Sequence, residues 1–496
     1  MTTAPLPLPA RLTPDACVRA LAARDPRFDG LFVVGITSTR IYCRPICPAR
    51  VSHTEHRRFF PSPASAEQAG FRPCLRCRPE LAPGRAPVDA ISRLGSAAAQ
   101  RIEAGALNGS SVTALAAELG VSARHLRRAL EREYGVSPSE LAQTCRLLLA
   151  KRLLADTSLS VTRIAFASGF QSLRRFNAAF RAQYRMSPTA LRRKRGRKDS
   201  LGDGLRLTLS YRPPLDWSGL LEMLERRALP GVEKINHGRY TRTVRLDGQA
   251  GVISVANADG HLIVEIASSL VPALMPLLPQ LRRLFDLDAE PLMIDDHLAR
   301  TGLAAQVLER PGVRLPGVLD PFEAVMSVLG RMGGSPQVLR RVVERLGEDF
   351  TSSDADVTHL APDAARVAAV GTDPLVEAGM DVTAARALVN VARAMSSGGL
   401  RLDAGGDMDA TCAQLQGAGV PEAAAQVIAV RTQCWPDAFP SNAGVSLEQA
   451  EAWRPWRGYA VALLELTPRL VGVKPGLYPY QSRPTAATAR SQRLPQ

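Results

Sequence analysis

Apolar residues recur at helical spacing along most of this chain, with one region in which they alternate instead. Over residues 88–193 they fall three or four positions apart, which predicts short amphipathic helices joined by tight turns. Residues 205–287 mix such helices with alternating stretches, clearest at 205–209 and 252–255, that are typical of half-buried strands. Helical spacing rich in Ala, Leu and Val returns over residues 288–475. The pattern therefore predicts a helical segment, a mixed segment and a second helical segment.

Turn-forming and charged stretches set the expected boundaries. A Pro/Gly stretch at 82–87 closes a first segment, and the basic run 192–198 predicts an exposed linker. At 496 residues the chain is too long for one core, so we expect a multidomain fold, mainly α with α+β parts. The expected parts are a small α+β domain with clustered cysteines (1–87), a helical domain with its basic linker (88–200), a mixed α/β domain (203–287), an all-α domain (288–480) and a disordered tail (481–496).

The net charge of +15 is unevenly distributed along the chain. Residues 1–200 hold 33 Lys/Arg against 14 Asp/Glu, whereas the remaining 296 residues hold 29 against 33. Counterion release favours a polyanion as the partner of the basic part, although a basic surface that only aids solubility is the alternative. No apolar run approaches a membrane span and no signal peptide precedes the first segment, so we expect a cytoplasmic protein with no membrane partner.

Four of the eight cysteines form two close pairs, Cys43-x3-Cys47 and Cys74-x2-Cys77. Two such pairs in one short module are typical of tetrahedral zinc. Spacing alone favours an inert structural site, but arginines surround the ligands and can hold a phosphate beside a zinc-bound thiolate, which is a nucleophile. The arginines near the ligands are Arg40, Arg44, Arg50, Arg72, Arg76 and Arg78. The isolated cysteines, which we expect to be small buried hydrophobes, are Cys17, Cys145, Cys412 and Cys434.

The segments Thr39–Arg50 and Ala69–Cys77 closely resemble the N-terminal domain of the Ada family of bacterial adaptive-response regulators. The resemblance covers about residues 13–82. It implies a zinc-dependent, single-turnover methyltransferase in which Cys43 accepts a methyl group from a DNA methylphosphotriester. The remaining zinc ligands implied are Cys47, Cys74 and Cys77, and the residues implied to lie near the DNA backbone are Thr39, Arg50, Arg72 and Arg76.

A helix, a glycine turn and a second helix occur twice, with the turns at Gly120 and Gly169. Each second helix has a polar face, and the whole pattern over 88–193 resembles the AraC-type transcription factors. The resemblance implies operator DNA and RNA polymerase as partners, whereas helical pairs used for protein contact are the alternative. The residues expected to contact double-stranded DNA are Arg124, Arg127 and Arg128 in the first unit and Arg174 and Arg175 in the second.

Residues 205–475 resemble the AlkA-type 3-methyladenine DNA glycosylases, most clearly in the stretches 310–323 and 453–460. The resemblance implies a helix-hairpin-helix in which Gly417 and Gly419 offer backbone amides to a DNA phosphate. The catalytic aspartate of that family is missing: Asn442 lies near its expected position, and no carboxylate occurs between Asp437 and Glu448.

These observations predict an alkylation sensor that activates transcription, fused to a glycosylase-like domain that has lost its catalytic acid. Two alternatives remain open at this stage. One is a working base-excision glycosylase fused to a regulator, and the other is a non-enzymatic AraC-type regulator with a structural zinc. The Pro-Cys-His-Arg signature of alkylguanine-DNA methyltransferases does not occur, so we expect no guanine repair.

Overall fold

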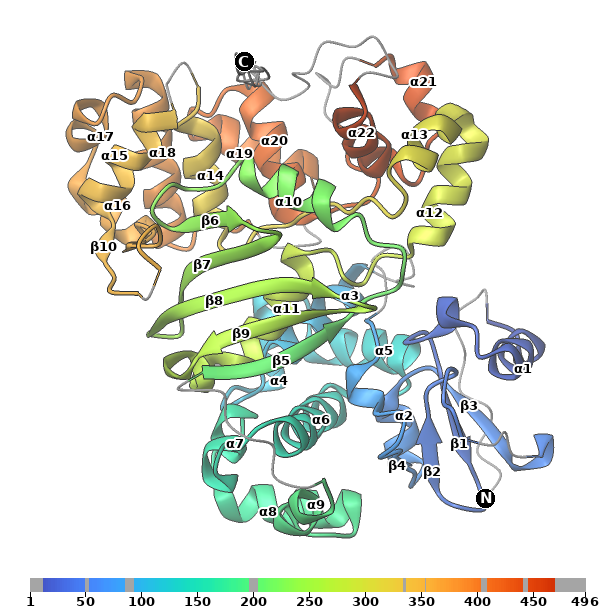
Figure 1. Cartoon of the computed structure of the whole chain (residues 1–496). Helices are drawn as coiled ribbons and strands as arrows, with labels where there is room; N and C mark the ends of the chain where they lie inside the picture. The colour runs from blue at the N-terminus through green and yellow to red at the C-terminus, as the bar shows by residue number, and fades with distance from the viewer. Residues whose placement is uncertain are drawn as a thin grey trace, which may run out of the picture.

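The computed structural model describes residues 12–49, 53–84, 93–195, 204–332, 336–352, 354–402, 408–439 and 445–468. The expected fold class is confirmed, because small α+β, helical, mixed and mainly helical parts follow one another along the chain (Figure 1). The expected tail lies outside the described residues. In the portion of the chain that the structure describes, no helix is both long enough and apolar enough to cross a membrane.

The cysteine part, residues 12–84, is built on a four-stranded sheet with the order β3-β1-β2-β4. β1 pairs antiparallel with β2 and β3, while β2 and β4 run parallel. Phe60 and Phe71 pack edge-to-face under the sheet with ring centroids 5.3 Å apart. The elements are α1 (Pro14–Ala23), β1 (Val33–Ile36), β2 (Ile41–Cys43), β3 (Arg57–Phe60), α2 (Pro63–Gln68) and β4 (Arg72–Pro73).

The helix-turn-helix part, residues 93–195, is arranged around the long helix α6. A capping box of Ser137 and Glu140 and a proline at the first turn begin this helix. Part of the expected basic linker is instead helical, because Arg192 to Arg195 continue the last helix and Arg192 bonds the Leu159 carbonyl. The helices are α3 (Arg93–Glu103), α4 (Val112–Glu118), α5 (Ala123–Tyr134), α6 (Pro138–Asp156), α7 (Val161–Ala167), α8 (Leu173–Tyr184) and α9 (Pro188–Arg195).

The sheet part, residues 204–287, contains a five-stranded antiparallel sheet with the order β5-β9-β8-β7-β6. The two alternating stretches of the sequence lie in β5 and β8, and their alternate side chains are buried. The elements are β5 (Gly204–Ser210), α10 (Trp217–Glu225), β6 (Glu233–Asn236), β7 (Arg239–Leu246), β8 (Gln249–Ala258), β9 (His261–Ala267) and α11 (Leu274–Leu284).

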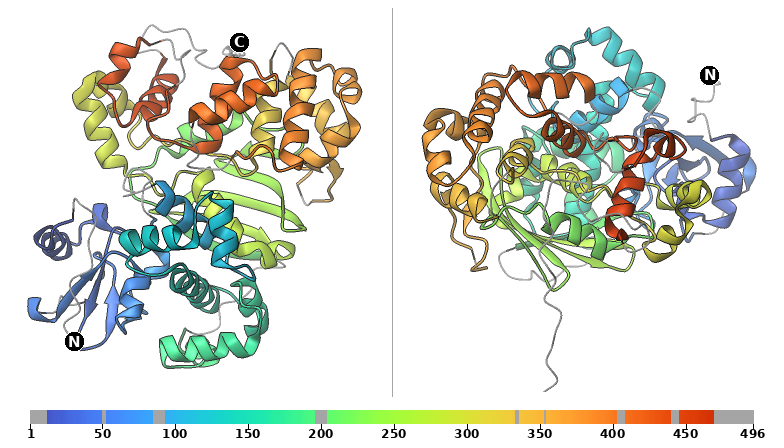
Figure 2. Two further views of the ribbon diagram at one scale, coloured as in Figure 1. Left: turned by 180° about the vertical axis from the view of Figure 1, so that it is seen from behind. Right: turned by 90° about the horizontal axis from the view of Figure 1, so that it is seen from above.

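The C-terminal part, residues 288–468, is helical apart from a two-residue strand pair, β10 (Glu348–Asp349) with β11 (His359–Leu360). It lies at the opposite end of the molecule from the second helix-turn-helix unit, α7 to α9 (Figures 1 and 2), and it contacts the first unit through Arg401, which donates to the Glu118 carbonyl over 3.4 Å. Its helices are α12 (Pro291–Leu298), α13 (Ala304–Glu309), α14 (Pro321–Leu329), α15 (Pro336–Leu346), α16 (Ala364–Val370), α17 (Asp373–Glu377), α18 (Val382–Ser396), α19 (Met408–Gly417), α20 (Glu422–Gln433), α21 (Leu447–Glu451) and α22 (Arg457–Leu466).

One continuous apolar cluster joins the second helix-turn-helix unit to the sheet part. It runs from Leu147 to Leu191 and on through Leu205 to Leu287. Polar contacts cross the same boundary: Arg152 donates to the Thr208 carbonyl, and Arg163 donates to the Ser268 carbonyl over 3.4 Å. The two parts therefore share a core instead of being joined only by a linker.

Candidate zinc centre and DNA-binding surfaces

The sheet register brings the two cysteine pairs together. Because β2 runs parallel to β4, with Tyr42 opposite Pro73, both strands end at the same edge and deliver Cys43 and Cys74 side by side. Cys47 and Cys77 lie in the turns that follow. The four sulfur atoms lie within 4.8 Å of one another.

The donor set and its surroundings fit zinc. Tetrahedral zinc bound at about 2.3 Å to each sulfur requires sulfurs about 4 Å apart, which this cluster can meet with small adjustments. The backbone amides of Arg44 and Arg76 point at Cys77 Sγ and Cys74 Sγ over 3.4 and 3.3 Å. Such N–H donors favour sulfur in its anionic form.

Cys43 is the most exposed of the four cysteine residues. Cys47, Cys74 and Cys77 are at most 8% exposed, whereas Cys43 is half-buried. Cys43 is therefore the side chain of the cluster that solvent reaches most easily.

The structure divides the arginines near the cluster into two groups. Arg44 turns inward, where it pairs with Asp29 and donates to the Cys77 carbonyl over 3.2 Å, and Arg78 pairs with Glu80 and with Asp156. These two arginines are structural. The remaining candidates face outward: Thr39 and Arg76 are exposed and Arg72 is half-buried.

Two further arginines belong with the expected DNA contacts Thr39, Arg72 and Arg76. Arg40, one of the arginines expected near the ligands but not among the DNA contacts that the resemblance implies, is exposed and lies over the Phe71 ring at 5.5 Å, close to Thr39. Its membership of the turn between β1 and β2 is the signal that the sequence offered. Arg50, an expected DNA contact, lies outside the described residues.

Each helix-turn-helix unit presents its arginines to solvent. In α5, Leu126 and Leu130 are buried, while Arg124, Arg127 and Arg128 are exposed on the other side. The glycine in the preceding turn, Gly120, has a positive φ of 69°.

The second unit repeats this arrangement. Phe176 and Phe180 are buried in α8, while Arg174 and Arg175 are exposed. Ser172 caps this helix by accepting a hydrogen bond from the backbone amide of Arg175. The aromatic residues are thus core, and the polar face is available to a partner.

A buried lysine connects the zinc centre to α6. Lys151 Nζ donates to the Cys74 carbonyl over 3.3 Å and pairs with Glu80, and both side chains are only 1% exposed. Arg78 joins the same network through Glu80 and Asp156. The sequence analysis did not single out Lys151. Its place within the run Leu147–Leu154, in which most residues are apolar, is the sequence signal that this lysine is buried.

A second polar link between the two parts involves Glu67 on α2. Its carboxylate accepts hydrogen bonds from Tyr42 Oη over 3.0 Å and from Thr144 Oγ1 over 2.8 Å. Burial raises the pKa of Glu67 to about 7. The carboxyl group therefore takes up a proton on folding at pH values between its ordinary pKa and 7.

We expect this proton uptake to make the protein less stable as the pH rises from about 4.5 to about 7. The stability of the variant Glu67→Gln should lack this pH dependence, because an amide does not titrate. The amide oxygen can still accept from one hydroxyl, and the other hydroxyl can turn to accept from the amide nitrogen. The unfolding midpoint of this variant, compared with that of the unsubstituted chain, should therefore be more favourable at pH 8 than at pH 6. Glu131→Gln, an exposed position on α5, is the control, and equal effects of the two variants at both pH values would contradict the prediction.

The C-terminal hairpin has the open geometry that a backbone contact requires. Gly417 ends α19 and Gly419 has a φ of +90°, and a Cβ added at either would meet no atom within 4 Å. Asn442 and the rest of 440–444 lie outside the described residues. Asp437 is held by Arg457 over 2.8 Å and by Arg454 over 2.9 Å, so it closes a turn.

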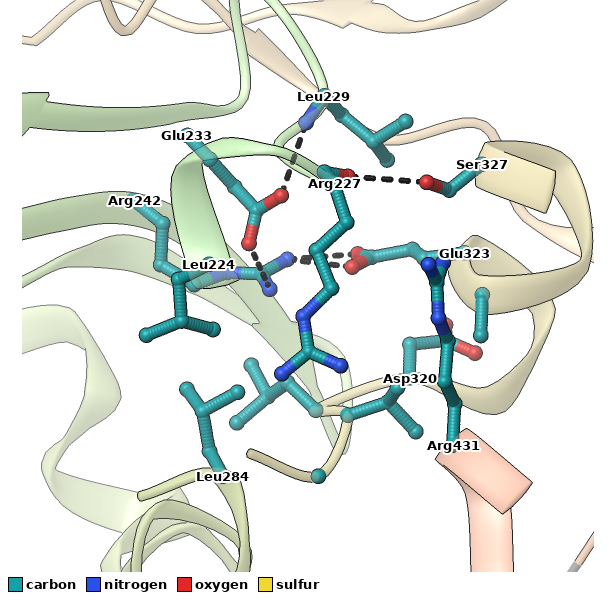
Figure 3. Close-up of a pocket in the computed structure, with 14 residues that line it drawn as sticks. Leu224, Arg227, Leu229, Glu233, Arg242, Leu284, Asp320, Glu323, Ser327 and Arg431 are labelled. Carbon is teal, nitrogen blue, oxygen red and sulfur yellow. Dashed lines mark hydrogen bonds and ion pairs between the residues drawn. The ribbon is translucent and has the colours of Figure 1, made fainter. Parts of the chain in front are cut away.

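A small cavity lies between the sheet part and the C-terminal part (Figure 3). Its volume of about 40 Å³ holds water but not a purine base. Three of its charged groups form one network: Arg242 donates to both Glu323 oxygens over 2.7 Å and to Glu233 over 3.1 Å. Burial raises the pKa of Glu323 to about 7. The cavity is therefore part of the contact between these two parts of the chain, not a base-binding pocket.

Three family models match successive regions of the chain, up to residue 320. Family models match for the metal binding domain of Ada at residues 16–80, a helix-turn-helix domain at 115–194 and the AlkA N-terminal domain at 206–320. The match to a metal binding domain, together with the sulfur cluster, confirms the prediction of zinc as the cofactor.

One relative is similar to nearly the full length of this chain, and others are similar to one part of it. A Mycobacterium tuberculosis protein, "Probable bifunctional transcriptional activator/DNA repair enzyme AlkA", is 34% identical over 479 residues, covering 91% of this chain and 96% of the relative. The Escherichia coli "DNA-3-methyladenine glycosylase 2" is 30% identical over 51% of this chain and 94% of its own length. The E. coli "Bifunctional transcriptional activator/DNA repair enzyme Ada" is 34% identical over 32% of this chain and 43% of its own length.

Proposed function

This chain belongs to the family of bifunctional transcriptional activators and DNA repair proteins that fuse Ada-type and AlkA-type domains, and we propose that its Cys43 accepts a methyl group from a DNA methylphosphotriester. The observation that carries the proposal is the greater exposure of Cys43 in a cluster of four cysteine residues. Cys47, Cys74 and Cys77 complete the zinc centre, which keeps the bound sulfurs in the thiolate form.

The transfer is a balanced displacement. Cys43 Sγ attacks the methyl carbon, an S–C bond forms, and the C–O bond to phosphorus breaks. The electron pair remains on the phosphate oxygen, which becomes an ordinary phosphodiester anion, and no proton moves. Thr39, Arg72 and Arg76 hold the backbone beside the sulfur, with Arg50 as a further proposed contact, because guanidinium groups bind phosphate oxygens through two hydrogen bonds.

Methyl transfer also changes the charge of the surface that faces DNA. The Cys43 thiolate becomes a neutral thioether, so one negative charge is lost. Removing a charge about 4 Å from a phosphate is worth roughly 1–4 kcal/mol, depending on the effective dielectric constant. This corresponds to about a tenfold to several-hundredfold gain in DNA affinity. The gain would promote operator binding and transcription, with RNA polymerase as the proposed partner.

One experiment tests the whole proposal. The purified chain is incubated with DNA carrying labelled methyl groups, and labelled Cys43 and free methylated base are measured together. Label on Cys43 without released base is the expected result. An unlabelled Cys43 in protein that has bound the methylated DNA would leave only a generic DNA-binding regulator.

The helix-turn-helix arginines provide a separate prediction. The pair Arg127→Ala and Arg128→Ala should weaken duplex binding and make its dependence on salt shallower, by about one in log–log slope for each phosphate that is no longer neutralised. Arg340→Ala, an exposed arginine on α15, should leave both quantities unchanged. Equal behaviour of the two variants in a titration at several salt concentrations would remove α5 from the DNA interface.

For the C-terminal part, we propose a glycosylase fold that has lost most of its base-releasing activity but still contacts DNA through Gly417 and Gly419. Asn442 is neutral and cannot stabilise a developing positive charge on the sugar. Asp437 cannot replace the missing acid, because it is bound by Arg454 and Arg457. The similarity to a relative named as a glycosylase keeps an active enzyme as the second candidate.

Restoring the acid tests this part of the proposal. A single missing preorganised charge typically costs about two orders of magnitude or more in rate. Gln416 and Pro421 also stand where the resembled glycosylases usually have proline and tryptophan, so we expect Asn442→Asp to release little 3-methyladenine from alkylated duplex. Chromatography of the free base is the measurement. Substantial release by the unsubstituted chain would establish the second candidate.

A further inference from the structure

A polar groove on the C-terminal part has no role in the function proposed above. It lies between α18 and the turn that joins α16 to α17, and its volume is about 360 Å³. Arg386, Asn390 and Arg393 form one wall, since residues seven apart with a third between them share a helix face. All three are exposed, and the remaining wall includes Thr372 and Asp373.

The two arginines of this groove are available to a ligand. Among the described residues, neither guanidinium group makes a hydrogen bond or an ion pair. Two other arginines of the same part are engaged: Arg341 donates to the Ala378 carbonyl over 2.7 Å, and Arg457 pairs with Asp437. With Asp373 as the one carboxylate among the lining residues, the groove carries a net charge of +1.

The groove is continuous with the glycine hairpin. Asn390 Nδ2 donates to the Ala418 carbonyl over 3.1 Å, and Ala418 is the middle residue of the 417–419 turn. The wall from Arg386 to Arg393 extends about 10 Å along the helix axis at 1.5 Å per residue. A strand that contacts the hairpin could therefore run along α18 past both arginines.

We propose that this groove binds the sugar-phosphate backbone of a DNA strand that runs on from the hairpin. Two guanidinium groups and the Asn390 amide are suited to phosphate and sugar oxygens, whereas the Thr372 hydroxyl already donates to Asp373 over 3.2 Å. The lining offers no aromatic surface on which a base could stack. The inference rests on the proposed hairpin contact, which sets the direction in which the strand runs along the groove. It is independent of methyl transfer at Cys43.

The test uses the full chain and follows individual arginines. Phenylglyoxal modifies accessible arginines, and mass spectrometry reports the rate at each position. An excess of a short duplex of arbitrary sequence at about 50 mM salt provides the ligand. We expect the duplex to slow modification of Arg386 and Arg393 several-fold, and to leave Arg340 on α15 unchanged.

The remaining arms separate the possible outcomes. Unchanged rates at Arg386 and Arg393, while Arg127 and Arg128 become protected, would overturn the proposal. Equal protection by inorganic phosphate at the same phosphate concentration would also overturn it, in favour of a site for a free anion.

The hairpin is tested separately with Gly417→Glu, which adds a carboxylate where the structure leaves open space. Loss of protection in this variant supports one continuous strand. Protection that persists supports the groove and rejects the hairpin contact, so the two ideas fail separately.

Discussion

We expect Cys43→Ala to abolish methyl transfer from alkylated DNA to this chain, and with it the methylation-dependent gain in DNA affinity. Alanine has no nucleophile, and the other three sulfurs are too buried for a phosphotriester to approach. The loss of transfer should be complete. The missing gain in affinity should be about tenfold to several-hundredfold, as estimated for one charge near a phosphate.

Intact-protein mass spectrometry measures the first effect as the absence of a single added methyl group, and a duplex titration before and after exposure measures the second. Cys412→Ala, a half-buried cysteine of the C-terminal part, is the control and should behave like the unsubstituted chain. Cys43→Ser, together with zinc analysis, shows whether the module still folds around its metal. A Cys43 variant that holds zinc and still gains affinity after exposure would contradict the charge-switch mechanism.

Lys151→Met should produce the second large effect, a loss of about 3–5 kcal/mol in the free energy of unfolding. Methionine fills a similar volume but leaves the Glu80 carboxylate buried with Arg78 as its remaining cationic partner. The Cys74 carbonyl also loses a donor. We therefore expect faster release of zinc to a chelator as well as a lower unfolding midpoint.

The double variant Lys151→Met/Glu80→Gln separates charge burial from packing. Removing both charges should cost less than the two single substitutions added together, because neither charge is then left alone. Arg132→Met, an exposed cation on α5, should change little. Additive effects of the two network substitutions would show that Lys151 acts through packing alone.

The sequence was informative wherever the relevant residues are close together along the chain. The cysteine pairs, the glycine turns at Gly120 and Gly169 and the alternating strands β5 and β8 are local patterns, and the structure contains each of them. Zinc could be predicted for the same reason, because four soft ligands within one short module leave few alternatives.

The sequence was less informative about which charged residues face inward. Arg44 and Arg78 looked like further phosphate contacts, but their partners Asp29 and Asp156 lie 15 and 78 positions away along the chain. Lys151 was missed for the same reason. The pairs of Arg78 and Lys151 depend on the packing of α6 against the cysteine part, and the pair of Arg44 depends on the fold of the cysteine part itself; local spacing reports neither.

The core shared by the helix-turn-helix and sheet parts also determines how DNA can be arranged around the protein. With that core intact the second helix-turn-helix unit cannot swivel against the sheet part, and α8 and α20 lie at opposite ends of the molecule (Figure 1). DNA shorter than its persistence length of about 150 base pairs resists tight bending. The protein would therefore join two separate duplexes, or the ends of a long loop, as a rigid spacer between an operator and a distant stretch of the chromosome.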